Sequence, residues 1–186
     1  MTDGPLLWYL NRSSGMILLV AFTLTTVLGV LSTHGRAGRG VPVFVTQALH
    51  RNTALLSVVL LVGHVTTAVV DTYVDIRWWQ ALVPWGATYE PLWFELGVVA
   101  LDLTVLVTLT SLVRARLTPR GWRLVHLSAY AAWAVSVAHG IGIGTDLRQD
   151  ERWAWLVVAG CVGAVLSAVL WRVGHLVVRS PARAVR

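Results

Sequence analysis

The chain has 186 residues, of which 56% are hydrophobic and 13% are charged, and its mean hydropathy is +0.67. An ordinary soluble domain has about 25% charged residues, so this composition excludes a soluble globule. The 15 basic residues, all arginine, outnumber nine acidic residues and give a formal charge of +6. In so apolar a chain this charge reflects membrane orientation, and we expect no nucleic-acid partner. The single cysteine, Cys161, excludes an intramolecular disulfide and a cysteine metal cluster.

Five apolar stretches predict transmembrane helices, because about 20 mainly apolar residues suffice to cross a bilayer. They cover about residues 6–31, 45–70, 91–113, 122–143 and 153–178. The first stretch lacks a basic leader and carries Arg12, so we expect a true span and not a cleaved signal. We therefore predict an all-α membrane protein, a single domain over residues 1–186 built as a bundle of five transmembrane helices.

The loop charges predict an orientation, since cytoplasmic loops collect arginine. Arginines gather after the first and third stretches and towards the tail, whereas the other two loops hold most of the acidic residues. We therefore expect the N-terminus outside and the C-terminus in the cytoplasm. The arginines that decide this are Arg36, Arg39, Arg114, Arg116, Arg120, Arg172, Arg179, Arg183 and Arg186. The segment Val74 to Pro84 contains two tryptophans and is too short to cross, which predicts an interfacial helix or a re-entrant cap.

Four histidines lie inside the predicted spans, where a polar side chain is costly and needs a role. His50 and His64 are 14 residues apart in the second span, and His126 and His139 are 13 apart in the fourth. Both spans run in the same direction, so the four form two levels about 20 Å apart at 1.5 Å per residue. A step of 13 residues places His126 and His139 about 140° apart around an ideal helix. This offset calls for a π-bulge, a kink, or bound groups that the two histidines approach from different sides.

Two imidazoles from opposite helices at each of two depths suit haem iron, whose axial positions they would fill. A zinc site would need three or four ligands at one level. We therefore predict that His50 with His126, and His64 with His139, are the axial ligands of two haem b groups. Two alternatives stay open: a proton relay through the histidines, and histidines that only form hydrogen bonds between helices.

Five further side chains are candidates around these levels. Arg12 could pair with a haem propionate or could snorkel to the outer headgroups. Arg51 and Arg123 flank the inner histidines and could hold propionates, or could be topogenic charges alone. Trp133 lies between the levels and could fill the gap between macrocycles or simply pack. Asp102 is in the middle of the third span, where a buried carboxyl would be protonated and donate a hydrogen bond or carry a proton.

The two histidine pairs resemble those of the ferric reductase-like transmembrane family, which includes NADPH oxidases, ferric-chelate reductases and the haem subunits of bacterial methionine sulfoxide reductase systems. The likeness covers most of residues 6 to 146. Besides the paired spacing it rests on four short strings: Leu7 to Arg12 (LWYLNR), Thr110 to Arg114 (TSLVR), Trp122 to His126 (WRLVH), and His139-Gly140 followed by Gly144-Thr145-Asp146.

This resemblance implies a multi-pass protein of the bacterial inner membrane with two stacked b haems that pass electrons outward. The chain lacks a flavin motif and a nucleotide-binding glycine loop, so a separate cytosolic flavoprotein with FAD or FMN, or a membrane quinol, is the expected donor. A ferric chelate, a flavin or a molybdenum protein outside is the expected acceptor. The chain would then be an oxidoreductase subunit with no catalytic acid, base or nucleophile of its own. Many relatives have six spans, so a partner could complete the surface. The rival interpretation is a proton-conducting channel or transporter that uses the histidines and Asp102.

Overall fold

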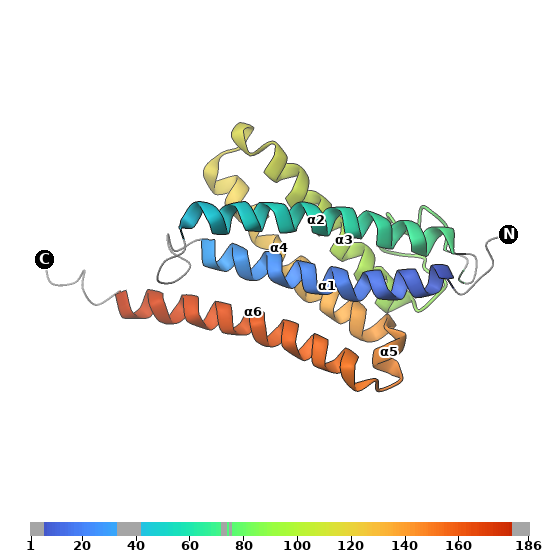
Figure 1. The fold of residues 1–186 in the computed structure, drawn as a ribbon. Helices are drawn as coiled ribbons and strands as arrows, with labels where there is room; N and C mark the ends of the chain where they lie inside the picture. Colours follow the sequence, from blue (N-terminus) through green and yellow to red (C-terminus); the bar gives the residue numbers. More distant parts are fainter. Residues whose placement is uncertain (1–5, 33–41, 72–73, 75, 180–186) are drawn as a thin grey trace, which may run out of the picture.

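The computed structural model describes residues 6–32, 42–71, 74 and 76–179, without the side chains of residues 176–179. Their helices, shown in Figure 1, are α1 (Leu6–Ser32), α2 (Val43–Val70), α3 (Pro91–Leu112), the 3-10 turn η1 (Arg114–Arg116), α4 (Pro119–Ile143), α5 (Thr145–Arg148) and α6 (Arg152–Arg179). Within these described ranges no β-strand occurs. Five helices, α1, α2, α3, α4 and α6, are long and apolar enough to cross a membrane. The predicted all-α, multi-pass architecture is thereby confirmed.

The ends of the helices follow local chemistry. Thr118 caps α4 by accepting a hydrogen bond from the Gly121 amide at 3.2 Å, and Pro119 occupies the first helical position. This cap starts α4 three residues before the expected residue 122. Glu90 has a left-handed backbone, with φ of 41°, immediately before Pro91 opens α3. The proline fixes where α3 begins, as the sequence predicted.

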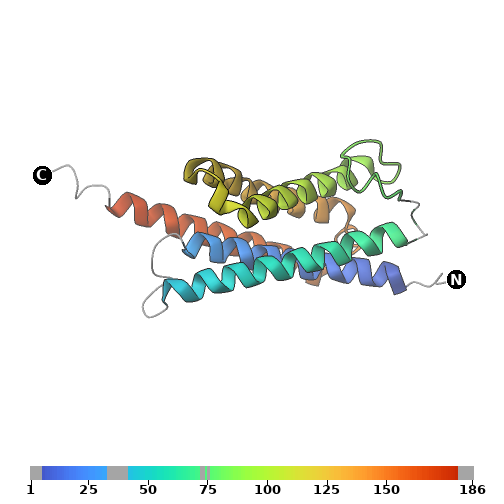
Figure 2. The ribbon, with the colours of Figure 1, turned by 90° about the horizontal axis from the view of Figure 1, so that it is seen from above.

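The segment before α3, which we expected to be an interfacial helix or a re-entrant cap, contains no helix among its described residues. Its described residues form successive turns around the buried side chain of Gln80. The Gln80 amide accepts from the Arg77 backbone N–H at 2.9 Å and donates to the Gly86 carbonyl at 2.8 Å. Trp78 and Trp85 stay largely exposed. In Figure 2 these turns cover the end of the bundle where α2 stops and α3 starts.

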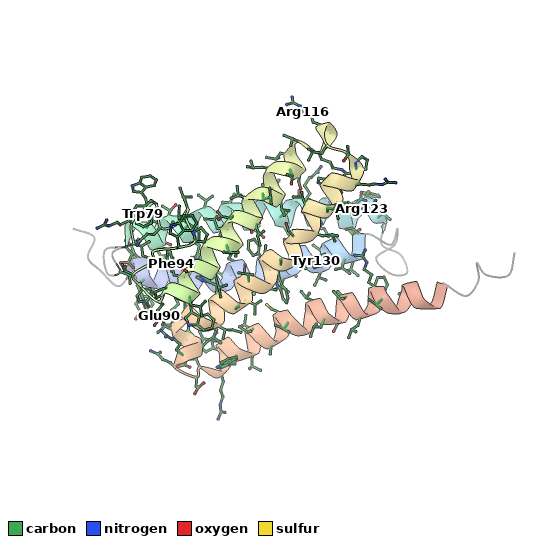
Figure 3. The ribbon with its side chains drawn as sticks, turned by 180° about the vertical axis from the view of Figure 1, so that it is seen from behind. Trp79, Glu90, Phe94, Arg116, Arg123 and Tyr130 are labelled. Carbon is green, nitrogen blue, oxygen red and sulfur yellow. The ribbon has the colours of Figure 1, made fainter. Side chains whose placement is uncertain are left out.

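The helices pack as two antiparallel hairpins. α1 lies along α2, and α3 lies along α4, while α2 makes almost no close backbone approach to α3 or α4. The second hairpin crosses the first obliquely (Figures 1 and 3). Helix α6 packs on α1, on the side away from α2. The two hairpins therefore leave space between α2 and α4 that side chains must fill or that a flat ligand could occupy.

One cluster of buried apolar side chains joins α6 to α1, α4 and α5. It consists of Leu19, Val137, Leu147, Ala154, Val158 and Cys161. The outward faces carry large exposed residues such as Leu124 and Leu156. A fully exposed apolar exterior suits lipid, which is as apolar as leucine.

Candidate functional site: two histidine pairs between the hairpins

The rings of His50 and His126 face each other across the gap between α2 and α4. Their centroids are 6.2 Å apart and their planes make an angle of 77°. An imidazole nitrogen binds a first-row metal at about 2 Å and lies about 1 Å from its ring centroid, so two axial imidazoles on one metal have centroids about 6 Å apart. The observed centroid separation therefore matches that of two histidines that share one metal ion.

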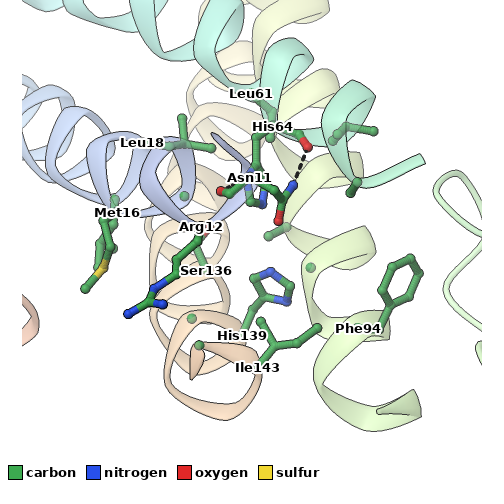
Figure 4. A pocket seen from close by; sticks show the side chains of 18 of the residues that line it. Asn11, Arg12, Met16, Leu18, Leu61, His64, Phe94, Ser136, His139 and Ile143 are labelled. Atoms are coloured by element: carbon green, nitrogen blue, oxygen red, sulfur yellow. Dashed lines mark hydrogen bonds between the residues drawn. The ribbon is translucent and has the colours of Figure 1, made fainter. Parts of the chain in front are cut away.

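The second pair, His64 and His139, lies at the other level, where the N-terminus of α1 meets the C-terminal end of α4. Both rings line a cavity of about 260 Å³ between the hairpins. Figure 4 shows the two imidazoles pointing towards one another from α2 and α4. The remaining wall is largely apolar and includes Leu18, Leu61, Phe94 and Ile143. The structure thus brings together both predicted pairs.

Three of the four histidines have the same orienting hydrogen bond, from ring Nδ1 to a backbone carbonyl of a neighbouring helix. The partners are Thr25 for His50 (2.8 Å), Asn11 for His64 (3.2 Å, with the Ser14 hydroxyl at the same distance) and Trp93 for His139 (2.7 Å). A carbonyl oxygen only accepts, so Nδ1 carries the proton and the lone pair remains on Nε2. This is the tautomer and the orientation that a metal ligand needs.

A glycine follows each accepting carbonyl by four residues along its helix. These glycines are Gly29, Gly15 and Gly97, opposite His50, His64 and His139 respectively. A Cβ added at Gly97 would lie 2.6 Å from Nδ1 of His139, and one at Gly15 or Gly29 would lie 3.1 or 3.2 Å from Cε1 of the facing ring. The missing side chain lets each imidazole lie against the helix and reach the carbonyl one turn back.

Sequence reasoning missed these glycines, although a signal was present. Gly15 and Gly29 are 14 residues apart, the same step as His50 and His64 on the antiparallel neighbour. Sequence reasoning also missed Asn11, whose backbone and side chain each form a hydrogen bond with His64. The Asn11 carbonyl accepts from the ring, and its side-chain amide donates to the His64 carbonyl at 2.8 Å, the dashed bond in Figure 4.

His126 differs from the other three histidines. Its Nδ1 is buried without a hydrogen-bond partner among the described residues. Its ring stacks instead on Trp122, with centroids 4.8 Å apart and planes at 24°. The Arg114 guanidinium in turn lies 4.3 Å from the Trp122 ring centroid. Stacking rather than a carbonyl therefore positions this imidazole.

Unsatisfied polar atoms gather at this same end. Three buried side-chain polar atoms around the turn from α3 to α4 lack a hydrogen-bond partner in the described chain: Ser111 Oγ, Trp122 Nε1 and His126 Nδ1. Buried polar groups are nearly always satisfied in folded proteins, so a cluster of exceptions indicates where a ligand or ordered water belongs.

The 13-residue step of α4 is accommodated without a bulge. From Pro119 to Ile143 the helix is continuous, with no π-helical turn. Figure 3 shows α4 crossing the first hairpin obliquely. His126 and His139 therefore leave different faces of α4, and each still lies opposite a histidine of α2. This arrangement agrees with the possibility that the two histidines approach their bound groups from different sides.

Arg12 lies beside the cavity in a bidentate ion pair with Asp146 of α5. Asp146 is 2% exposed, although the sequence suggested only an outer-loop charge. The Arg12 guanidinium also lies 4.9 Å from the Trp8 ring centroid. This placement agrees with its predicted position near His64 and His139. The carboxylate of Asp146 forms the ion pair that we considered for a haem propionate.

None of the other candidates lines this cavity. Arg51 and Arg123 are exposed and form no ion pair within the described ranges. Trp133 donates from Nε1 to Thr23 Oγ1 at 3.0 Å and packs against the core cluster, and it does not line the cavity. Asp102 is exposed on α3, outside that cavity. Arg36, Arg39, Arg183 and Arg186, which helped to predict the orientation, lie outside the described residues.

Comparisons with known proteins give a family but no activity. The described residues contain no group of three or more histidine, cysteine or acidic side chains that could hold a metal ion. No curated protein and no solved structure matches the chain. One family model matches residues 6–146, the range that holds all four histidines, and the chain therefore belongs to the family described as a domain of unknown function, DUF8596.

Proposed function

We propose that the chain binds two haem b groups between its hairpins, one held by His50 and His126 and the other by His64 and His139. The observation that carries the proposal is the geometry of the first pair. Two imidazoles from different helices face each other with centroids 6.2 Å apart, the separation that a shared axial metal requires. Helix bundles build such sites from facing side chains.

The residues around the pairs suit a flat apolar group with acidic edges. The cavity between the hairpins at His64 and His139 has a mostly apolar wall, and α2 and α4 make few close backbone contacts. At the level of His50 and His126, the buried Trp122 Nε1 lacks an acceptor, and Arg51 and Arg123 are without an ion pair in the described chain. These donors could hold propionate carboxylates.

Bound haem supplies one-electron chemistry, so we infer that the chain carries electrons across the membrane from a cytoplasmic flavoprotein or a quinol to an acceptor outside. The arginine-rich turn at Arg114 and Arg116 supports a cytoplasmic location for the level of His50 and His126. The other level would then face outward. A location in a bacterial inner membrane, a separate donor with FAD or FMN, and a ferric-chelate, flavin or molybdenum acceptor rest on the resemblance to ferric reductase-like proteins.

The rival function, a proton channel or transporter, has less support. It needs a polar path between the levels, yet Asp102 is exposed on α3 and does not line the cavity. Between the levels Trp133 donates to Thr23 and packs in the apolar cluster. The orienting bonds at three histidines also fix one tautomer, whereas a relay requires rings that exchange protons at both nitrogens.

Single replacements of the four histidines test the proposal. We expect the purified wild-type protein to carry two haem b groups, and we expect His50→Ala and His64→Ala each to lose one of them, because each removes one axial ligand. His175→Ala is the matched control, since this histidine lies on α6 beside Trp171 and belongs to neither pair. Haem content and the reduced-minus-oxidised spectrum are measured on monodisperse protein. Equal haem content in His64→Ala, His50→Ala and His175→Ala would contradict the pairing.

A further inference from the structure

The two pairs are not equivalent in what holds their rings. At the level of His64 and His139, both imidazoles donate from Nδ1 to a backbone carbonyl. At the other level only His50 does so, while His126 has an unpartnered Nδ1 and a tryptophan against its face. The sequence of α3 differs between the two levels in the same way, with Gly97 opposite His139 and Thr110 at the position 13 residues later.

The replacement for the carbonyl is a series of three stacked groups. Arg114 lies over Trp122, and Trp122 stacks on His126, which faces His50. The Trp122 ring limits rotation of the imidazole about its side-chain bonds. A cation over an indole is attracted by the ring quadrupole, so Arg114 stabilises the Trp122 orientation in turn.

We propose that Trp122 and Arg114 are positioning residues for His126, and that they give the site of His50 and His126 the higher reduction potential of the two. The inference rests on the haem sites proposed above. A hydrogen bond from Nδ1 to an acceptor raises the basicity of a ligating histidine, which favours the ferric state. The lack of that bond at His126, together with the positive charge of Arg114, favours the ferrous state. Both effects have the same sign.

The charge effect has a built-in control. Arg114 and Arg116 belong to the same 3-10 turn, and both are exposed at the end of the bundle. Only Arg114 lies over the Trp122 ring, while Arg116 points away from the helices in Figure 3. A general loss of positive charge affects both variants, whereas loss of the stack affects only Arg114→Gln.

The test is a redox titration of the purified protein followed in the visible spectrum, with the two steps assigned by comparison with His64→Ala. We expect the site retained in His64→Ala to have the higher potential. Arg114→Gln and Trp122→Leu should lower the potential of that step and alter the low-spin ferric resonance spectrum. Trp122→Phe should restore the resonance spectrum, since a phenyl ring still stacks, and should shift the potential less than Trp122→Leu does, since it keeps the stack and lacks only the indole N–H. Arg116→Gln and Trp171→Phe should leave both steps near their wild-type positions.

Three results would overturn the proposal. The retained site could have the lower potential, Arg114→Gln could shift it no more than Arg116→Gln, or Trp122→Leu could leave both the potential and the resonance spectrum unchanged. If Trp122→Leu does not fold, Arg114→Gln decides the outcome by itself. Failure of the haem assignment is distinct, because wild-type protein would then contain no haem to titrate.

Discussion

Gly97 offers the sharpest single substitution in the site. A Cβ at this position would lie 2.6 Å from both Nδ1 and Cε1 of His139 and 3.1 Å from Nε2. Helix α3 carries Gly97 and the Trp93 carbonyl on the same face, so α3 cannot move Gly97 away from the His139 ring without also moving the Trp93 carbonyl away. Gly97→Ala must therefore push the His139 ring away and lengthen its 2.7 Å hydrogen bond to Trp93.

The cost follows from two terms of one sign and one of the opposite sign. Overpacking a well-packed site costs about 1–3 kcal/mol, and a weakened buried hydrogen bond costs about 0.5–1.5 kcal/mol. Alanine regains about 1 kcal/mol of helix propensity over glycine. The net loss in the free energy of haem binding through His139 is about 1–3 kcal/mol, which corresponds to about a tenfold to hundredfold loss of haem affinity.

The assay is haem binding to the purified protein at the level of His64 and His139, followed by spectral titration. Gly160→Ala is the matched control, because a Cβ at this membrane glycine would meet nothing within 4 Å. We expect Gly97→Ala to lose affinity at one site and Gly160→Ala to bind as wild type does. Wild-type affinity in Gly97→Ala would refute the claim that this glycine makes room for a ligating imidazole.

Three further predictions concern contacts that the structure shows directly. Gly15→Ala and Gly29→Ala place a Cβ at 3.1 Å from Cε1 of His64 and at 3.2 Å from Cε1 of His50. Each should reduce haem affinity at its own level by less than about tenfold. A larger effect than that of Gly97→Ala would contradict the distances. Asp146→Asn leaves Arg12 without its carboxylate and should lower the free energy of unfolding in detergent by about 1–3 kcal/mol. The double variant with Arg12→Gln should lose less stability than the sum of the two single losses, and additive losses would argue against the ion pair. Thr23→Val removes the acceptor of Trp133 and should cost about 0.6–1.7 kcal/mol, against no loss for the exposed Thr66→Val, and equal melting temperatures for the two would show that the bond contributes nothing.

Much of the fold could be predicted from hydropathy, because lipid demands long apolar helices whatever their partners are. The five spans appear within a few residues of their expected limits. The segment from Val74 to Pro84 was expected to be an interfacial helix or a re-entrant cap, and its described residues form turns and no helix. There, the interior hydrogen bonds of Gln80 decide the conformation, and a hydrophobic pattern does not report them.

The pairing of the histidines could also be predicted, because residue spacing sets depth along a helix. The partners of the rings could not, since they depend on how the hairpins cross. Asn11, Gly29 and Gly97 contribute backbone groups or empty space, which leave little trace in one sequence. Asp146 was missed for a different reason, because a carboxylate in a short loop is ordinarily solvated.

The central claim is that two imidazole pairs hold two haem groups between the hairpins. The most direct measurement is the ratio of haem b to protein in wild-type chain purified from membranes of haem-replete cells, together with its reduced-minus-oxidised spectrum. The account predicts two haem groups per chain, with a b-type spectrum that titrates in two steps. Monodisperse, folded protein that remains colourless after haem is supplied would contradict it.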